Sequence, residues 1–324
     1  MVQDEIPTVS IDDLRLSASS LKTYANCPRK FFLQKIVKEQ PTHPENIYTW
    51  IGTLVHTATY YSIADYTDGT WHVGDKKSIT EVKNFFEILW ESDGDIDIIR
   101  RLTDDSVIDL ERPNFSSRPV NDTKLLKDVT LTDEDKWKSL AWSLVKNGYN
   151  LMTGVVLELD GVKSVQLEVP LSFRRYGANF IGYIDIFVET ENGIAFFDLK
   201  TSRRPITKPD KDIQFFLYRM GLREQYGLDY PPPGYYVHLR SGRLYPANTD
   251  DLEVFKEMDE KISSLIGGIL DNRFEPNLGS PLCPYCDYRG FCFVGGEVLT
   301  AASVLDLNIL LPETIPDDLP IVED

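Results

Sequence analysis

Apolar residues recur at helical spacing near the start of the chain. Between positions 17 and 38 the apolar side chains return every three or four residues, and a serine at position 17 or 19 can cap that segment. Pro28 lies inside the pattern, and a proline ring cannot continue an intrahelical hydrogen-bond ladder. We therefore expect a helix over 17–38 that kinks or breaks just after Cys27.

The helical period continues through the first half of the chain. It predicts helices near 48–66, 81–91 and 133–152, and the last opens on a capping box formed by Thr132 and Asp135. The stretch 92–130 is polar and rich in turn residues, which favours an irregular or mobile insertion.

The period changes to two between residues 154 and 247, which predicts β-strands. The segment 182–201, GYIDIFVETENGIAFFDLKT, has two apolar arms joined by Asn192-Gly193, and 234–245 forms a second hairpin that turns at Ser241-Gly242. Amphipathic helices are predicted at 212–226 and 250–270. Strands interleaved with helices in this order predict an α/β or α+β domain.

Charged residues interrupt the first hairpin. A two-residue turn at Asn192-Gly193 predicts that Asp185 stands opposite Lys200 and that Asp198 is a diagonal neighbour of Asp185. All three side chains then project from the same face, because side chains alternate along a strand. Two carboxylates and an ammonium are thus predicted to crowd onto a largely apolar patch.

This cluster has two interpretations. Lys200 could simply form a cross-strand ion pair with Asp185 on a solvated face, but that leaves Asp198 unexplained beside the apolar run IAFFDL. Two buried carboxylates repel each other unless a cation lies between them. Carboxylate oxygens are the ligands that Mg²⁺ and Mn²⁺ prefer, and a neighbouring lysine can orient or deprotonate a bound water. The cluster therefore predicts metal-dependent phosphodiester hydrolysis.

The net negative charge of the chain argues against a nucleic-acid partner, but the charges are unevenly distributed along the sequence. The 324 residues carry a formal net charge of -17, and seven acidic residues without any lysine or arginine follow position 296. Basic residues gather at 29–38 and again at 200–211, directly after the first hairpin. Such clusters are commonly solvated faces, but binding a phosphate backbone requires only a local basic groove.

Several features point to an intracellular protein. The chain has no run of 18 apolar residues, and its first 13 residues are acidic where a secretory signal would be basic and then apolar. We therefore expect a cytoplasmic, thiol-reducing setting and no membrane association. In that setting the four cysteines are expected to bind metal rather than form disulfides.

The pattern Gly182-x-x-Asp185 followed by Asp198-x-Lys200 resembles the core of the PD-(D/E)XK nuclease superfamily. The resemblance implies a restriction-endonuclease-like fold, with a central mixed β-sheet flanked by helices, and a DNA nuclease in which Asp185, Asp198 and Lys200 serve catalysis. Its RecB-type branch implies further site residues. These are His56 in GTLVH as a metal ligand, Glu168 in VQLEVPL, and Gln214 and Tyr218 in QFFLY.

The cysteines add a second resemblance. Cys27 near the start and the three of Cys283-x2-Cys286-x5-Cys292 resemble the iron-sulfur staple of AddB-type and CRISPR-associated RecB-like nucleases. The resemblance implies a 4Fe-4S cluster that joins the two ends of the chain. Four thiolates would equally suit Zn²⁺, so the identity of the metal stays open.

Together these patterns predict one nuclease domain over 1–296 and an acidic tail over 297–324. The domain contains a helical insertion at about 60–152 and a nuclease sheet at about 154–247. The expected function is an Mg²⁺- or Mn²⁺-dependent deoxyribonuclease, an exonuclease on single-stranded DNA or DNA ends, in repair, viral DNA metabolism or CRISPR adaptation. The alternative is a catalytically silent subunit that binds DNA ends and works with protein partners in a DNA-processing complex.

Overall fold

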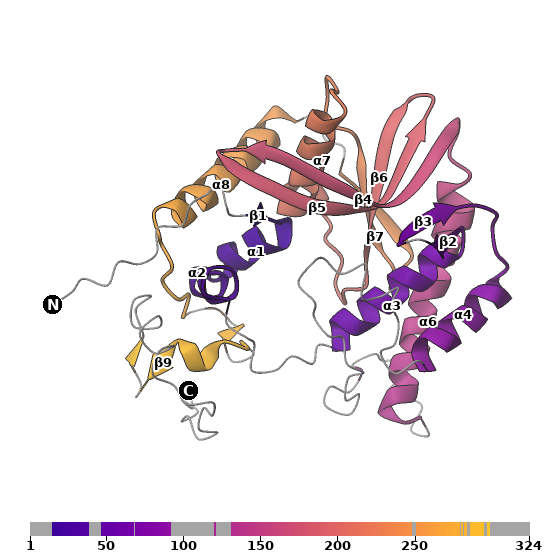
Figure 1. Ribbon diagram of the computed structural model, residues 1–324, viewed down its shortest axis with the longest axis horizontal. Helices are drawn as coiled ribbons and strands as arrows, with labels where there is room; N and C mark the ends of the chain where they lie inside the picture. Colours follow the sequence, from indigo (N-terminus) through magenta and orange to yellow (C-terminus); the bar gives the residue numbers. More distant parts are fainter. Residues whose placement is uncertain are drawn as a thin grey trace. The chain divides into compact units, whose positions relative to one another are not determined.

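The computed structural model describes residues 15–38, 47–67, 69–91, 120, 131–247, 251–278, 280, 282–283, 286–294 and 297–298. They divide into two compact units (Figure 1). We call Met1–Pro44, Ser172–Gly182 and Asp251–Asp324 the terminal unit, and Glu45–Leu171 with Tyr183–Asp250 the central unit. Of the acidic tail, only 297–298 lies within the described residues, as strand β10 (Glu297–Val298), which pairs with β9 (Phe293–Val294).

A mixed six-stranded sheet is the main element of the fold. Its order is β1-β5-β6-β7-β8, with β4 also pairing with β5. The strands are β1 (Arg15–Leu16), β4 (Val162–Arg175), β5 (Ala178–Thr190), β6 (Gly193–Lys200), β7 (Gly234–His238) and β8 (Arg243–Ala247). Pairs β5–β6 and β7–β8 are antiparallel, whereas β6 and β7 are parallel and joined by helix α7 (Ile213–Gln225). The predicted α/β fold with a mixed sheet flanked by helices is therefore confirmed.

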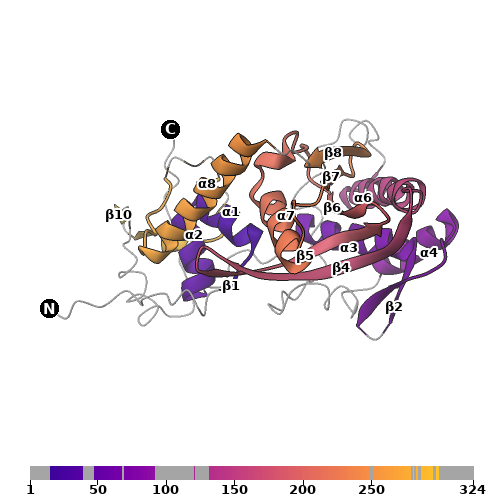
Figure 2. The same ribbon diagram turned by 90° about the horizontal axis from the view of Figure 1, so that it is seen from above.

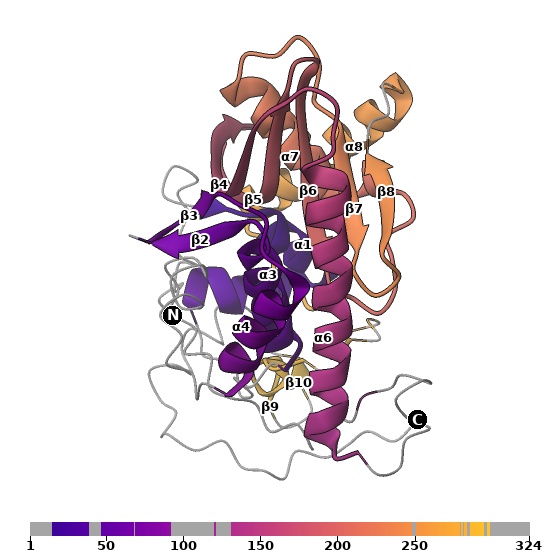
Figure 3. The same ribbon diagram turned by 90° about the vertical axis from the view of Figure 1, so that its right-hand side faces the viewer.

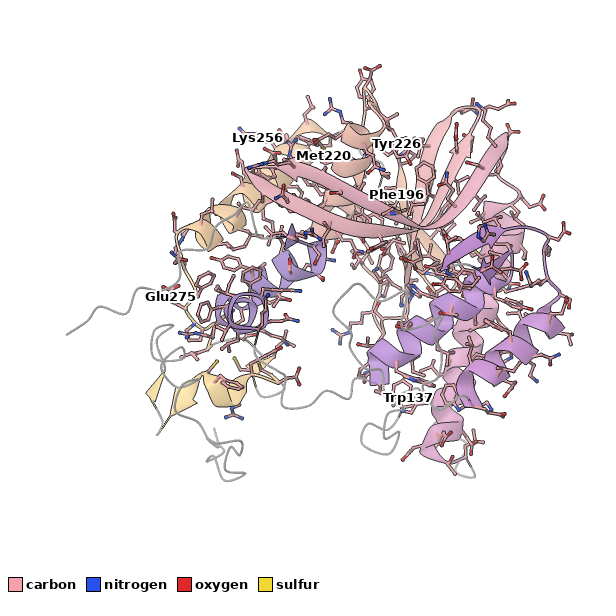
Figure 4. All side chains as sticks on the ribbon, viewed as in Figure 1. Trp137, Phe196, Met220, Tyr226, Lys256 and Glu275 are labelled. Carbon is pink, nitrogen blue, oxygen red and sulfur yellow. The ribbon has the colours of Figure 1, made fainter. Side chains whose placement is uncertain are left out.

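In the central unit, three helices pack together on one side of this sheet. They are α3 (Ile47–Tyr61), α4 (Ile79–Glu91) and α6 (Asp133–Leu151), and Figure 3 shows α6 running beside α3. Helices α3 and α6 pack against the sheet, and α4 packs against those two. Apolar residues of α3 and α6 form one buried cluster with the sheet residues Ile186, Val188, Phe197 and Leu199. Trp137 of α6, labelled in Figure 4, belongs to the same cluster.

Helix α7 packs on the face of the sheet opposite to Phe197 and Leu199, and Figure 2 shows it close to β5. The ring of Phe215 stacks on Phe196 with centroids 5.7 Å apart, and Tyr218 meets the same ring edge-on at 6.1 Å. Phe196 lies on the face that also carries Asp198 and Lys200, because these residues are two apart along β6. Helix α7 therefore lies over the polar end of that strand.

The terminal unit is built around an aromatic cluster of Tyr24, Phe31, Phe32 and Phe274. Ser17, one of the two predicted caps, opens helix α1 (Ala18–Asn26), and the chain breaks at Cys27 before the short helix α2 (Pro28–Phe31) and a π-helical turn (Phe32–Val37). The hydroxyl of Tyr24 donates to the carbonyl of Arg273, just beyond helix α8 (Leu252–Leu270), at 2.8 Å. The predicted interruption after Cys27 is confirmed.

Two details of the prediction were wrong. The first hairpin pairs Thr190 with Gly193, so its turn is Glu191–Asn192 rather than Asn192-Gly193, and every partner shifts by two residues. The Thr190 hydroxyl donates to the Gly193 carbonyl and accepts from the Asn192 N–H, which stabilises the earlier turn. A shift of two keeps each side chain on its predicted face.

The second error concerns the helix predicted at 48–66. It ends at Tyr61, and residues 64–67 and 70–73 form a small hairpin of strands β2 (Ala64–Thr67) and β3 (Thr70–Val73). The capping box at Thr132 and Asp135 is confirmed. The insertion predicted at 92–130 lies outside the described residues, apart from Val120. None of the described helices combines the length and apolarity needed to cross a bilayer.

Candidate active site

Three ligating side chains from three different elements converge in the central unit. They are His56 of α3, Glu168 of β4 and Asp185 of β5, and one nitrogen or oxygen of each lies within 4.8 Å of the other two. Across the described ranges, this is the only set of three or more histidine, cysteine or acidic residues that meets this spacing. Asp198, expected to be a metal ligand, lies outside the set.

Asp185 lies where β5 and β6 separate. The backbone pairing of the two strands ends at Ile186 and Phe197, and the N–H of Leu199 donates to Oδ2 of Asp185 at 2.6 Å. The carboxylate thus takes a hydrogen bond beyond the end of the ladder. Burial raises the pKa of Asp185, although the Lys200 ammonium and the Leu199 N–H oppose the shift.

Glu168 occupies an unusual backbone conformation. Its φ of 51° lies in the left-handed region, which is uncommon for a residue other than glycine inside a strand. Burial, followed by the charge of Asp185, raises the pKa of Glu168 to about 8, and a hydrogen bond with Tyr60 only partly opposes this. A strained residue whose charge is disfavoured is typical of a functional position.

His56 is suited to bind a cation. Burial, followed by the nearby charge of Lys200, lowers the pKa of its imidazole to about 4, so the ring is neutral at pH 7. Its Nδ1 lies 3.9 Å from Oδ2 of Asp185, and the ring also hydrogen-bonds the backbone of Leu199. A backbone hydrogen bond of this kind fixes the orientation of a metal-binding imidazole.

A buried ion pair lies beside these three residues. Nζ of Lys200 is 2.6 Å from Oδ2 of Asp198, whose side chain is only 1% exposed. Burial lowers the pKa of Lys200, but the charges of Asp198 and Asp185 outweigh it and raise the pKa above its usual value. Lys200 is therefore a permanent cation at the edge of the site.

The QFFLY motif connects α7 to this ion pair. Nε2 of Gln214 donates to Oδ1 of Asp198 at 2.9 Å and to the Tyr218 hydroxyl at 3.0 Å. The backbone N–H of Gln214 is bound in turn by Asp212, which caps α7. The motif therefore holds the carboxylate that binds Lys200, and its two polar residues share one helix face four positions apart.

The donor set of the site fits a divalent cation. Two partly buried carboxylates and a neutral imidazole offer oxygen and nitrogen ligands to such a cation. Burial raises the pKa of both Glu168 and Asp185, and the charge of Asp185 raises that of Glu168 further, so a cation between them would favour ionising both. Mg²⁺ and Mn²⁺ suit such oxygen-rich sites.

The four cysteines all belong to the terminal unit. Asn277 joins their two segments, because its side-chain Nδ2 donates to the Asn26 carbonyl at 2.9 Å and its backbone carbonyl accepts from the Cys283 thiol at 3.2 Å. Burial, with the neighbouring thiols Cys286 and Cys27, raises the pKa of Cys292 to about 12. The thiols are thus near neighbours, but no three of their sulfur atoms lie within 4.8 Å of one another among the described residues.

The predicted site residues lie together, but Glu168 rather than Asp198 joins the metal-binding set. His56, Glu168 and Asp185 come together, while Asp198, Lys200, Gln214 and Tyr218 form the adjoining network. Tyr60 was not predicted from the sequence, yet it hydrogen-bonds Glu168 and its hydroxyl lies 3.5 Å from Nδ1 of His56. Its position four residues after His56 on a helix was the available signal.

Comparison with known proteins identifies the family of this chain. The family model of the PD-(D/E)XK nuclease superfamily matches residues 15–293. No curated protein matches the chain significantly. A crystal structure from Eubacterium rectale that bears the name "Putative exonuclease" is 12% identical, covers 92% of this chain and 94% of its own, and has a TM-score of 0.40. A likeness this weak carries no argument about activity.

Proposed function

Because the chain belongs to the PD-(D/E)XK nuclease superfamily, we propose that it is a metal-dependent DNA nuclease, acting as an exonuclease on single-stranded DNA or DNA ends. Membership supports a nuclease and implies DNA as the substrate. One observation carries the rest of the proposal: His56, Glu168 and Asp185 converge beside the Lys200–Asp198 ion pair.

Each residue of the site has a distinct role in this proposal. His56, Glu168 and Asp185 would hold Mg²⁺ or Mn²⁺, which when bound polarises a phosphoryl oxygen and makes water a stronger nucleophile. Lys200 keeps its proton because its pKa is raised, so it stabilises negative charge on the phosphate rather than removing a proton from water. Asp198 positions Lys200 through their 2.6 Å contact.

End-labelled single-stranded and duplex DNA, incubated with Mg²⁺, Mn²⁺ or EDTA, tests the proposal. Lys200→Ala should abolish cleavage, with circular dichroism to check that the fold survives the loss of the Asp198 partner, whereas Lys163→Ala, which removes an exposed lysine of β4, should cleave like the wild type. A Lys200→Ala protein that cuts at the wild-type rate would refute the mechanism. If the wild-type protein binds DNA ends without cutting them, the alternative function, a catalytically silent end-binding subunit, is favoured instead.

We also infer that Cys27, Cys283, Cys286 and Cys292 bind one metal centre. The raised pKa of Cys292 supports this, because a bound cation would offset the repulsion and the desolvation of buried thiolates. Four thiolates would also suit Zn²⁺, but the spacing of five residues between Cys286 and Cys292 favours a 4Fe-4S cluster.

Metal analysis after anaerobic purification tests this second proposal. A brown protein with about four iron atoms per chain, the content of one 4Fe-4S cluster, is the expected result. A colourless protein with one zinc and no iron would contradict the iron-sulfur proposal and indicate a zinc site.

A further inference from the structure

A cavity of about 680 Å³ opens in the central unit beside the candidate metal site. His56, Glu168 and Lys200 line part of it, so the cavity is continuous with that site. Its remaining walls extend well beyond these residues, along α3 and along the segment that follows β6. The volume lies within the roughly 300–1,000 Å³ typical of pockets for small organic ligands.

The cavity is positively charged in a protein that is strongly acidic overall. Lys200, Arg203 and Arg240 line it, and Glu168 is its one acidic lining residue, whereas the whole chain has a net charge of -17. The α3 wall contributes threonine, glycine, histidine and tyrosine but no acidic side chain. A cavity of this composition favours a phosphate-bearing ligand.

Arg240 is held close to the end of strand β6, which carries Asp198 and Lys200. Its Nε donates to the carbonyl of Thr201 at 3.1 Å, and the N–H of Leu239 donates to the carbonyl of Lys200 at 3.0 Å. Two successive residues after β7 therefore bind two successive carbonyls at the end of β6. These bonds tie Arg240 to the end of the strand that carries Lys200, so both cations line the same cavity.

Tyr48 lies on the α3 wall of the same cavity. The residue is 51% exposed, yet its ring contacts the buried ring of Trp137 edge-to-face, with centroids 5.5 Å apart and planes at 80°. The contact restrains the ring while much of it remains open to solvent. A restrained, exposed aromatic ring in a basic cavity is a platform on which an unpaired base can stack.

We infer that this cavity is a subsite for single-stranded DNA next to the bond that is cut. Arg203 and Arg240 bind backbone phosphates, and Tyr48 stacks on a base of the same strand. In a duplex the bases are already stacked and paired, so the ring selects a single strand. The inference rests on the proposed nuclease function and adds the residues that determine its substrate form.

Fluorescence anisotropy of a short labelled oligonucleotide tests the subsite, with the full chain in EDTA so that binding is measured without cleavage. Tyr48→Ala should weaken binding roughly 5- to 100-fold, the loss of one stacked base. Arg240→Ala should lower the slope of log Kd against log salt by about 0.7, the loss of one phosphate contact on a single strand. The matched controls are Tyr230→Ala and Arg243→Ala, both exposed and outside the cavity lining.

An abasic oligonucleotide isolates stacking from any general effect of the substitution. Removing the bases should weaken binding to the wild type by the factor that Tyr48→Ala costs, and should weaken binding to Tyr48→Ala no further. If Tyr48→Ala does not fold, Tyr48→Leu keeps an apolar contact for Trp137 and serves instead. The subsite would be overturned if Tyr48→Ala and Arg240→Ala both bound the oligonucleotide within twofold of the wild type. It would also be overturned if the two control variants lost as much affinity, or if the wild type bound a duplex as tightly as a single strand.

Failure of the subsite and failure of the nuclease proposal give different results. If the binding losses occur but Lys200→Ala still cuts DNA, the subsite stands and the proposed mechanism fails. If Lys200→Ala is inactive but Tyr48→Ala and Arg240→Ala bind like the wild type, the mechanism stands and the subsite fails.

Discussion

Replacing Glu168 with glutamine should stabilise the metal-free protein at neutral pH while weakening its response to metal. The carboxyl has a pKa of about 8 in the folded protein, against 4.5 for an unperturbed glutamate, because it is buried close to Asp185. Below pH 4.5 it is neutral in both the folded and the unfolded chain. Between pH 4.5 and about 8 only the folded chain holds the proton, so stability falls as the pH rises.

The size of the effect follows from the shift in pKa. At pH 7 the unfolded carboxyl is ionised while the folded one is mostly protonated, which corresponds to roughly 3 kcal/mol at 1.36 kcal/mol per pKa unit. The Glu168 residue is partly exposed, so solvent screening reduces the expected gain for Glu168→Gln to about 1–2 kcal/mol. The amide can still accept the hydrogen bond from Tyr60 and has nearly the same shape.

Chemical denaturation in EDTA at pH 5, 6, 7 and 8 measures this prediction. The difference in unfolding free energy between Glu168→Gln and wild type should grow with pH, and Mg²⁺ or Mn²⁺ should raise the Tm of the wild type more than that of the variant. Glu189→Gln, an exposed position on β5, is the control and should show neither effect. Parallel stability curves for Glu168→Gln and wild type would refute the electrostatic account of the site.

Three further predictions test the surrounding structure. Gln214→Ala should lower kcat about 10- to 100-fold with little change in KM, because it removes the donor that holds Asp198; a change confined to KM in steady-state assays would contradict this role. Gly268→Ala should destabilise the protein by about 1–3 kcal/mol, since a Cβ there would collide with the Tyr24 hydroxyl, whereas Gly267→Ala has open space and should stabilise α8 by up to about 1 kcal/mol; equal Tm values for the two variants would disprove the α1–α8 packing. Cys27→Ala should lower the iron content and the Tm far more than it alters cleavage chemistry, and an unchanged Tm with lost activity would contradict a structural role.

Local sequence signals predicted most of the secondary structure. The Ser17 and Thr132 caps, the break at Cys27 and the two main hairpins follow from hydrogen bonds and turn preferences among residues close in the chain. The first hairpin was predicted with its turn one position too late. The faces of its strands were still correct, because moving a two-residue turn by one position shifts each partner by two.

The chemistry of the site was determined only in part by the sequence. The hairpin pattern placed Asp185, Asp198 and Lys200 on neighbouring strands, because it depends on residues close together in the chain. The resemblance to a known family marked His56 and Glu168 as candidates. Which carboxylates share a ligand set depends on where β5 and β6 separate and on how α3 packs against the sheet. Those are long-range contacts, and they bring Glu168 into the set and leave Asp198 to hold Lys200. The cavity lined by Tyr48 and Arg240 likewise exists only once segments almost 200 residues apart in the chain have folded together.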